Sequence, residues 1–141
     1  MATYPAVNLV TSPLVGSLMN RYGRLNVLFS GLVTLTVATL LYGMARSVFW
    51  LFVASGLHGA SLSLIHVSSL ALLSAFPERI TEGMGGIEVW SGVALVIGPP
   101  LGGLAHPLGG VSSMFVLMAM FPLAMLAFVP RIQHLMRSAK V

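Results

Sequence analysis

Two histidines within one apolar stretch are the residues of this chain best suited to proton chemistry. His58 and His66 share one side of a helix with Ser55 when residues are projected at about 100° each. Imidazole changes charge near physiological pH, so this face could contact a polar solute or carry a proton. The alternative is that both histidines are neutral and hydrogen-bonded to neighbouring helices.

A single acidic residue, Glu88, lies well inside an apolar stretch, whereas Glu78 and Glu82 lie near the edge of that stretch. An unpaired carboxylate at membrane depth is unfavourable, so we expect Glu88 to meet a partner, a cavity or an organic cation. The alternative is that its side chain extends to the membrane interface, which is about two turns away.

The spacing of these residues argues against catalysis and against a metal site. His58 and His66 are separated by about 12 Å along a helix, too far to share one zinc ion, and no nearby carboxylate completes a ligand set. The chain has no cysteine, so thiolate ligands are absent. No nucleophile and base have the spacing of a catalytic group, and we expect no enzymatic activity, no metal and no cofactor.

The composition indicates an integral, multi-pass membrane protein. Hydrophobic residues make up 57% of the 141 residues and charged residues only 7%, too few to cover a soluble domain with polar surface. The basic residues are scattered singly and form no patch, so nucleic acid is not an expected partner. The expected partner of most of the surface is the lipid bilayer.

The elements that position these residues are expected to be five transmembrane helices in one domain, residues 1–141. A spanning helix needs about 20 mainly apolar residues, and five short strands could not close a barrel, so the predicted fold is an all-α membrane protein. The first span is the shortest and contains Pro5. The predicted spans cover about residues 4–19, 25–45, 48–76, 81–105 and 111–129.

The basic residues predict the orientation of the spans. Six of the seven flank the same ends of the spans, and only Arg46 lies at the opposite ends. Since basic residues accumulate on the cytoplasmic side, we expect the carboxyl terminus in the cytoplasm and the amino terminus on the outer or lumenal side. The six are Arg21, Arg24, Arg79, Arg131, Arg137 and Lys140.

Two motifs resemble signatures of the major facilitator superfamily of transporters. The segment from Gly16 to Arg24 reads GSLMNRYGR and resembles the G-x-L-x-D-R-x-G-R signature between the second and third helices of that family. The segment from Ala94 to Gly103 reads ALVIGPPLGG and is similar to the fifth-helix antiporter motif. The two motifs have the order and separation expected for that family.

The resemblance implies a role for each motif. The first implies a gating loop on the cytoplasmic side, in which Asn20 replaces the family's aspartate and cannot form the same charge relay. The second implies a bent helix whose small residues pack against neighbouring helices and limit leakage. The implied gating-loop residues are Gly16, Asn20, Arg21, Gly23 and Arg24, and the implied antiporter-motif residues are Ala94, Gly98, Pro99, Gly102 and Gly103.

The resemblance also implies where the chain belongs in a transporter. Its spans correspond to helices two to six of the amino-terminal six-helix half-domain, so the chain is incomplete relative to a twelve-helix transporter. The residues around Glu88 look like the vesicular amine and polyamine transporter branch. The implied activity is that of a proton-coupled antiporter, in a plasma or vesicle membrane, for a small organic solute such as a cationic amine or polyamine.

The implied solute or proton pathway comprises Ser55, His58, His66 and Glu88. Its expected partners are the solute, the proton and the missing half of the transporter or other membrane helices. The alternative is a truncated or degenerate membrane protein that does not transport and keeps only the packing of the family.

Overall fold

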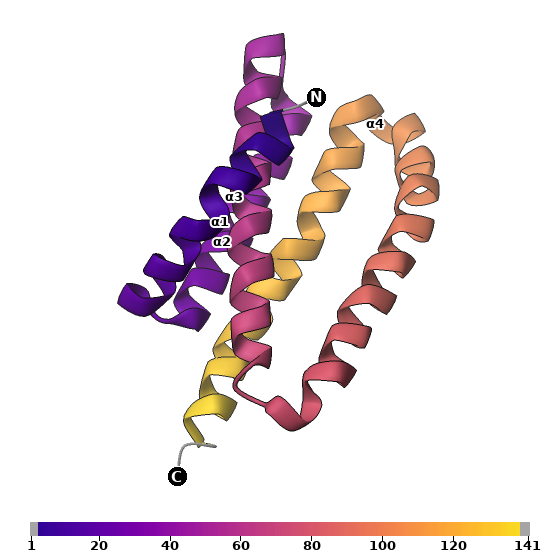
Figure 1. Ribbon diagram of the computed structural model, residues 1–141. Coiled ribbons are helices and arrows are strands. Elements are labelled where there is room, and N and C mark those ends of the chain that lie inside the picture. Colours follow the sequence, from indigo (N-terminus) through magenta and orange to yellow (C-terminus); the bar gives the residue numbers. More distant parts are fainter. Residues whose placement is uncertain (1–2, 139–141) are drawn as a thin grey trace.

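The computed structural model describes residues 3–138, with side chains for residues 11, 13–78, 80–107, 109–128, 130 and 131. Every regular element in this part of the chain is a helix (Figure 1). The elements are α1 (Thr3–Tyr22), α2 (Arg24–Met44), α3 (Val48–Leu73), the short 3₁₀ helix η1 (Pro77–Arg79) and α4 (Ile80–Ser138).

The long helix α4 consists of two arms that fold back on each other. Its backbone leaves helical geometry at Gly109 (φ −177°, ψ 25°) and Gly110 (φ 68°, ψ −152°), and the positive φ of Gly110 is one that glycine adopts without strain. The first arm is Ile80–Pro107 and the second arm is residues 109–138. Pro99 and Pro100 lie in continuous helix.

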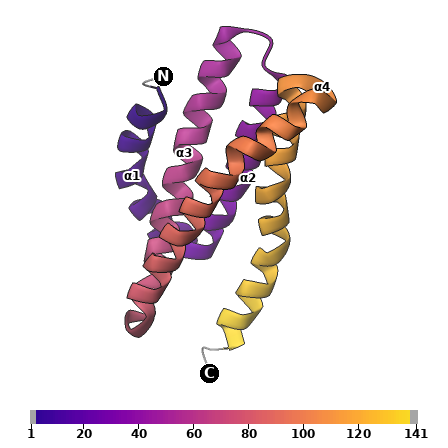
Figure 2. The same ribbon diagram turned by 90° about the vertical axis from the view of Figure 1, so that its right-hand side faces the viewer.

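Four helical segments are long and apolar enough to cross a membrane by length and composition. They are Arg24–Met44, Val48–Leu73, Ile80–Pro107 and Gly109–Phe128, and α1 is a fifth helix of 20 residues. The all-α membrane fold expected from the sequence is therefore confirmed. Successive helices run in opposite directions, so the α1–α2 turn and η1 lie at one end of the molecule, and the α2–α3 turn and Gly110 lie at the other (Figures 1 and 2).

Helices α2 and α3 form the centre of the packing, because α2 contacts both α3 and α4 extensively and α3 also contacts α1. Where α2 and α3 approach closely, a Cβ on Gly31 would lie 2.9 Å from the Leu64 Cβ and 2.9 Å from the Ile65 Cγ1. Small residues permit such approach in lipid, where the hydrophobic effect does not drive helices together. We call the contact between α2 and α3 the seam. The buried residues of these two helices are Val27, Gly31, Thr36, Ala38 and Thr39 on α2 and Ala54, Gly59, Ser61, Ser63 and Ser68 on α3.

Two buried hydroxyl groups of α2 and α3 donate to carbonyls of their own helices. Ser61 donates to the His58 carbonyl at 2.7 Å, and Thr36 donates to the Leu32 carbonyl at 2.9 Å. Such bonds satisfy a polar group without a partner on another helix.

The two arms of α4 differ in how they pack. The second arm lies along α2, where Ser112 Oγ donates to the Gly43 carbonyl at 2.6 Å and the Phe115 ring stacks on Tyr42 at 5.2 Å. The first arm stands apart, with 6% of its span buried against 33% for α2. Gly102 of the antiporter motif is nevertheless buried, and the expected packing of this helix against its neighbours stays a prediction.

Candidate functional site

The predicted gating loop is almost entirely helical. Helix α1 continues through Tyr22, so Asn20 and Arg21 lie in its last turn, and Arg24 already begins α2. The reversal takes place at Gly23, whose φ of 87° is in the region that favours glycine. Sequence reasoning foresaw the tight glycine turn but assigned the flanking residues to a loop.

Arg24 connects this turn to the end of α3. Its Nη1 donates to the Ala71 carbonyl at 2.6 Å, and Ser74 Oγ donates to the same oxygen at 2.8 Å. The last carbonyls of a helix lack partners within the helix and carry its negative dipole end, so an arginine there is favourable. Arg24 therefore binds the carboxyl end of α3.

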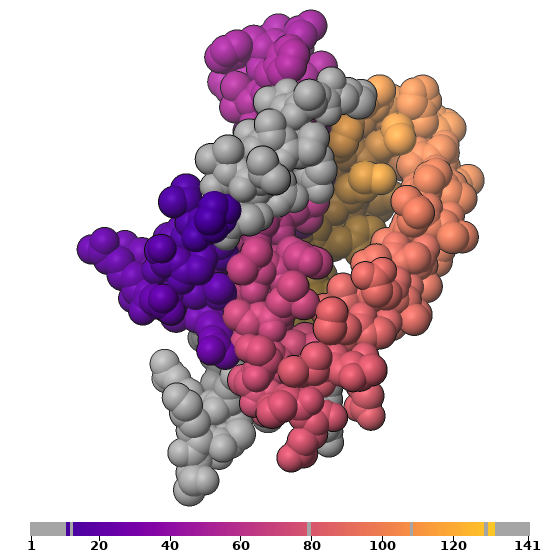
Figure 3. Space-filling model, in the orientation of Figure 1, coloured from indigo at the N-terminus to yellow at the C-terminus, as the bar shows by residue number. Residues whose placement is uncertain are grey.

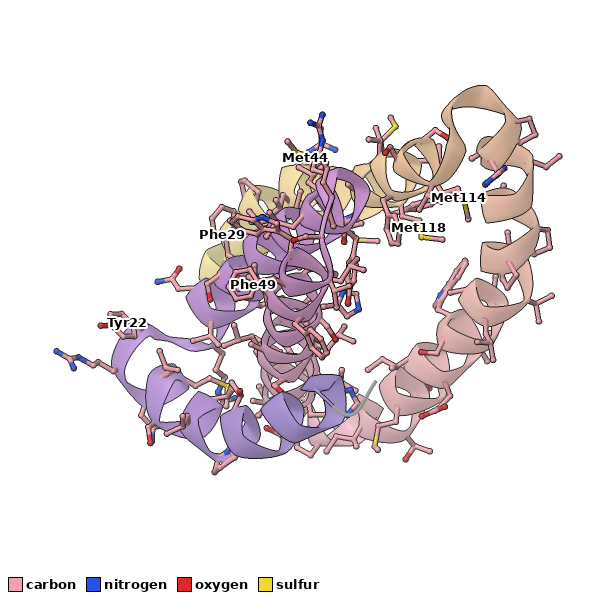
Figure 4. All side chains as sticks on the ribbon, turned by 90° about the horizontal axis from the view of Figure 1, so that it is seen from above. Tyr22, Phe29, Met44, Phe49, Met114 and Met118 are labelled. Carbon is pink, nitrogen blue, oxygen red and sulfur yellow. The ribbon has the colours of Figure 1, made fainter. Side chains whose placement is uncertain are left out.

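The remaining motif residues make fewer contacts. Arg21 is exposed, and its guanidinium lies 5.6 Å from the centre of the Tyr22 ring, which points away from the other helices (Figure 4). Asn20 is exposed, and a Cβ on Gly16 would meet no atom within 4 Å. Sequence reasoning missed Asn26, whose Nδ2 donates to the Tyr22 carbonyl at 2.9 Å and caps α1; its place four residues after Tyr22 is the available signal.

The two histidines of α3 lie in different surroundings. His58 is half-buried, and its ring meets the edge of Tyr42 on α2 with 6.0 Å between ring centres. Ser55, one turn earlier, is also half-buried. His66, two turns later, is exposed and lines a groove. The structure therefore separates the predicted pathway residues along α3.

A groove of about 970 Å³ separates α3 from the first arm of α4. Figure 3 shows this hollow between the magenta α3 and the salmon-to-orange first arm. His66 and Ser69 line it from α3, Trp90 and Ser91 line it from the first arm, and Met125 of the second arm also contributes. Within the described residues, the side chains of His66, Ser69 and Ser91 make no hydrogen bond.

Glu88 does not take part in this groove. Its side chain is exposed, and the groove face of the first arm is formed by neighbours at helical spacing such as Ile87, Trp90 and Ala94. Within the described residues, no group of three histidine, cysteine or acidic side chains could hold a metal ion. Of the four predicted pathway residues, His66 lines the groove, and Ser55, His58 and Glu88 do not.

The antiporter-motif residues are spread over different surroundings. Ala94 lines the groove, whereas a Cβ on Gly98 or Gly103 would meet no atom within 4 Å. A Cβ on Gly102 would lie 2.8 Å from the Cε of Met114 on the second arm, and Met114 and Met118 point into the space between the arms (Figure 4). Pro99 is exposed.

Sequence reasoning did not select Trp90 as a site residue. Its position in a groove depends on how α3 turns into the first arm, through residues 74–79. The available signal is the spacing of Gly83, Ile87, Trp90 and Ala94, which places them on one face of a helix. That spacing alone does not identify the facing helix.

Comparison with known proteins gives consistent matches. A family profile described as Major Facilitator Superfamily matches residues 1–139. The human synaptic vesicular amine transporter is 26% identical over 125 residues, covering 84% of this chain and 24% of that protein. The rat chromaffin granule amine transporter is 30% identical over 125 residues, covering 86% of this chain and 24% of that protein. The rat MFS-type transporter SLC18B1 is 42% identical over 62 residues, covering 44% of this chain and 14% of that protein.

The chain spans about a quarter of the length of the amine transporters that it matches. The family profile, in contrast, matches almost every residue of the chain. The apolar helices and this match together identify an integral, multi-pass membrane protein. The chain belongs to the Major Facilitator Superfamily.

Proposed function

We propose that the chain forms part of a secondary active transporter that exchanges a small organic amine for protons. Membership of the superfamily supports transport, and the names of the human and rat amine transporters support an amine as the solute. The groove between α3 and the first arm of α4 is the structural observation that carries the proposal, because it offers a concave, partly polar surface between membrane helices.

In this proposal, His66 contacts the solute or the proton, since it is the predicted pathway residue whose side chain lines the groove. Ser55 and His58 continue the pathway toward the other end of α3. The exposed carboxylate of Glu88 meets the cationic end of the amine outside the groove. An acidic residue at membrane depth suits that role.

The proposed partner of the chain is the rest of the transporter. Alternating access needs two halves that move around a shared site, and the exposed first arm of α4 leaves surface for further helices. We propose that Gly23 and Arg24 belong to the gate, because they join α1, α2 and α3 at one end of the bundle. That end is proposed to face the cytoplasm, in either the plasma membrane or a vesicle membrane.

A segment exchange tests the proposal. The matching segment of the rat chromaffin granule amine transporter is replaced by this chain, and uptake of radiolabelled tryptamine is measured in membrane vesicles. We expect uptake that requires an inside-acidic pH gradient and stops when a protonophore is added. His66→Ala should lower the rate, and Ser30→Ala, on the exposed surface of α2, should not.

Proteoliposomes that contain only these 141 residues provide a second measurement for this test. We expect no tryptamine uptake from them, because the chain lacks an opposing half. A correctly inserted chimaera without uptake would favour the non-transporting alternative. Uptake by the isolated chain would contradict the need for a further partner.

A further inference from the structure

We infer that the groove recognises the uncharged part of a solute, a flat apolar body with a hydrogen-bonding end, and not an ammonium charge. The inference rests on the proposed function only for the assignment of the groove to the transport pathway. It concerns which chemical feature of a solute the groove binds, and it disfavours a linear polyamine as its ligand.

The first observation concerns the charges near the groove. Among the described residues that line it, none is acidic. Glu88 does not line it, and Glu82 lines an adjoining hollow near the start of the first arm, which shares Gly83 with the groove. A cation that enters the groove would lose part of its hydration without gaining a carboxylate partner.

The second observation concerns the polar groups that line the groove. Within the described part of the chain, the side chains of His66, Ser69 and Ser91 make no hydrogen bond. Polar groups between membrane helices gain from a partner, because lipid offers none. An imidazole and two hydroxyls can each donate or accept, so they match an uncharged hydroxyl or carbonyl group of a solute.

The third observation concerns the apolar groups that line the groove. Trp90 is 73% exposed and lines the groove across from the α3 residues Leu62 and Ile65. An indole ring offers a large flat surface on which a ring-sized body can pack. One indole can also attract one cation, but a polyamine brings several ammonium groups, and the described lining offers no carboxylate for any of them.

Trp90 itself provides a direct measurement. The chain has two tryptophans, so Trp50→Phe leaves Trp90 as the sole indole reporter. The full chain in lipid nanodiscs is titrated with 2-phenylethanol, 2-phenylethylamine and spermidine while its fluorescence is followed. We expect saturable changes with both phenyl compounds, with affinities within about fivefold of each other, as an exposed cation–π contact allows. Spermidine should cause no change.

Three variants separate groove binding from other effects. Trp90→Phe leaves Trp50, which lies at the start of α3, and its fluorescence should not change saturably. His66→Ala in the Trp90 reporter should weaken binding of 2-phenylethanol by about three- to tenfold, the effect of one hydrogen bond. Ser30→Ala, on α2 outside the groove, should leave the affinity unchanged.

Two results would overturn the inference. Equal changes at Trp50 and Trp90, or changes that do not saturate, would mean that the probes dissolve in the bilayer. Tighter binding of spermidine or of 2-phenylethylamine than of 2-phenylethanol by more than about tenfold would mean that charge is recognised, since it exceeds an exposed cation–π contact. If either result accompanies tryptamine uptake by the chimaera, the proposed function stands and this inference alone fails.

Discussion

Arg24 joins two helices that are far apart in the sequence. Its guanidinium donates to the Ala71 carbonyl, 47 residues later, in the last turn of α3. Because the same oxygen also accepts from Ser74, this helix end is satisfied by two side chains. The arginine therefore has a structural role beyond its contribution to the positive charge of this end.

Replacing Arg24 by alanine should lower the stability of the bundle by about 1 kcal/mol, because an exposed, charge-assisted hydrogen bond at a helix end is lost. Arg21→Ala is the matched control, since Arg21 is exposed and its guanidinium lies over the ring of the adjacent Tyr22. The midpoint of unfolding by sodium dodecyl sulfate, followed by tryptophan fluorescence, measures both variants. Equal midpoints for the two variants would show that the bond to Ala71 does not stabilise the fold.

At the scale of elements, the contact between α2 and α3 depends on the absence of a side chain at Gly31. A Cβ there would lie 2.9 Å from the Leu64 Cβ, an atom fixed to the backbone of α3. The two helices would have to separate to accommodate it. Gly92 on the first arm of α4 differs from Gly31, because an added Cβ there would meet no atom within 4 Å.

Gly31→Ala should therefore be less stable than Gly92→Ala by about 1–3 kcal/mol, the usual range for overpacking. Comparing the two variants cancels most of the gain in helix propensity, up to about 1 kcal/mol, that alanine brings at either position. The amount of monodisperse protein after heating, measured by size-exclusion chromatography, ranks them. A Gly31→Ala chain as resistant to heat as Gly92→Ala would mean that the seam does not limit the stability of the bundle.

The helices themselves could be predicted from the sequence, because lipid leaves the backbone little alternative to helix. Their contacts could not, since small residues occur on several helices and the sequence does not say which of them meet. The glycines around Pro99 suggested close packing, yet the close contact between α2 and α3 forms at Gly31. The polar face of α3 was predicted from the sequence. That His58 contacts Tyr42 while His66 lines the groove could not be predicted, because it depends on the neighbouring helices.

At the scale of the whole molecule, the basic residues gather at one end of the helices. Arg21 and Arg24 flank the α1–α2 turn, and Arg79 ends η1 at the same end of the bundle, whereas Arg46 lies in the α2–α3 turn at the other end (Figure 1). Cytoplasmic ends of membrane helices carry an excess of arginine and lysine. The proposed orientation follows from this asymmetry.

Labelling of single cysteines should reveal that orientation, because the chain has no cysteine of its own. Ser47→Cys places a thiol between α2 and α3, and Ala75→Cys places one between α3 and η1; both positions are exposed. With the chain in the plasma membrane of intact cells, a membrane-impermeant maleimide should label Ser47→Cys directly and Ala75→Cys only after permeabilisation. The cysteine-free parent should give no signal under either condition. The reverse pattern would put Arg21 and Arg24 outside the cytoplasm, and labelling of both variants in intact cells would mean that α3 does not cross the membrane.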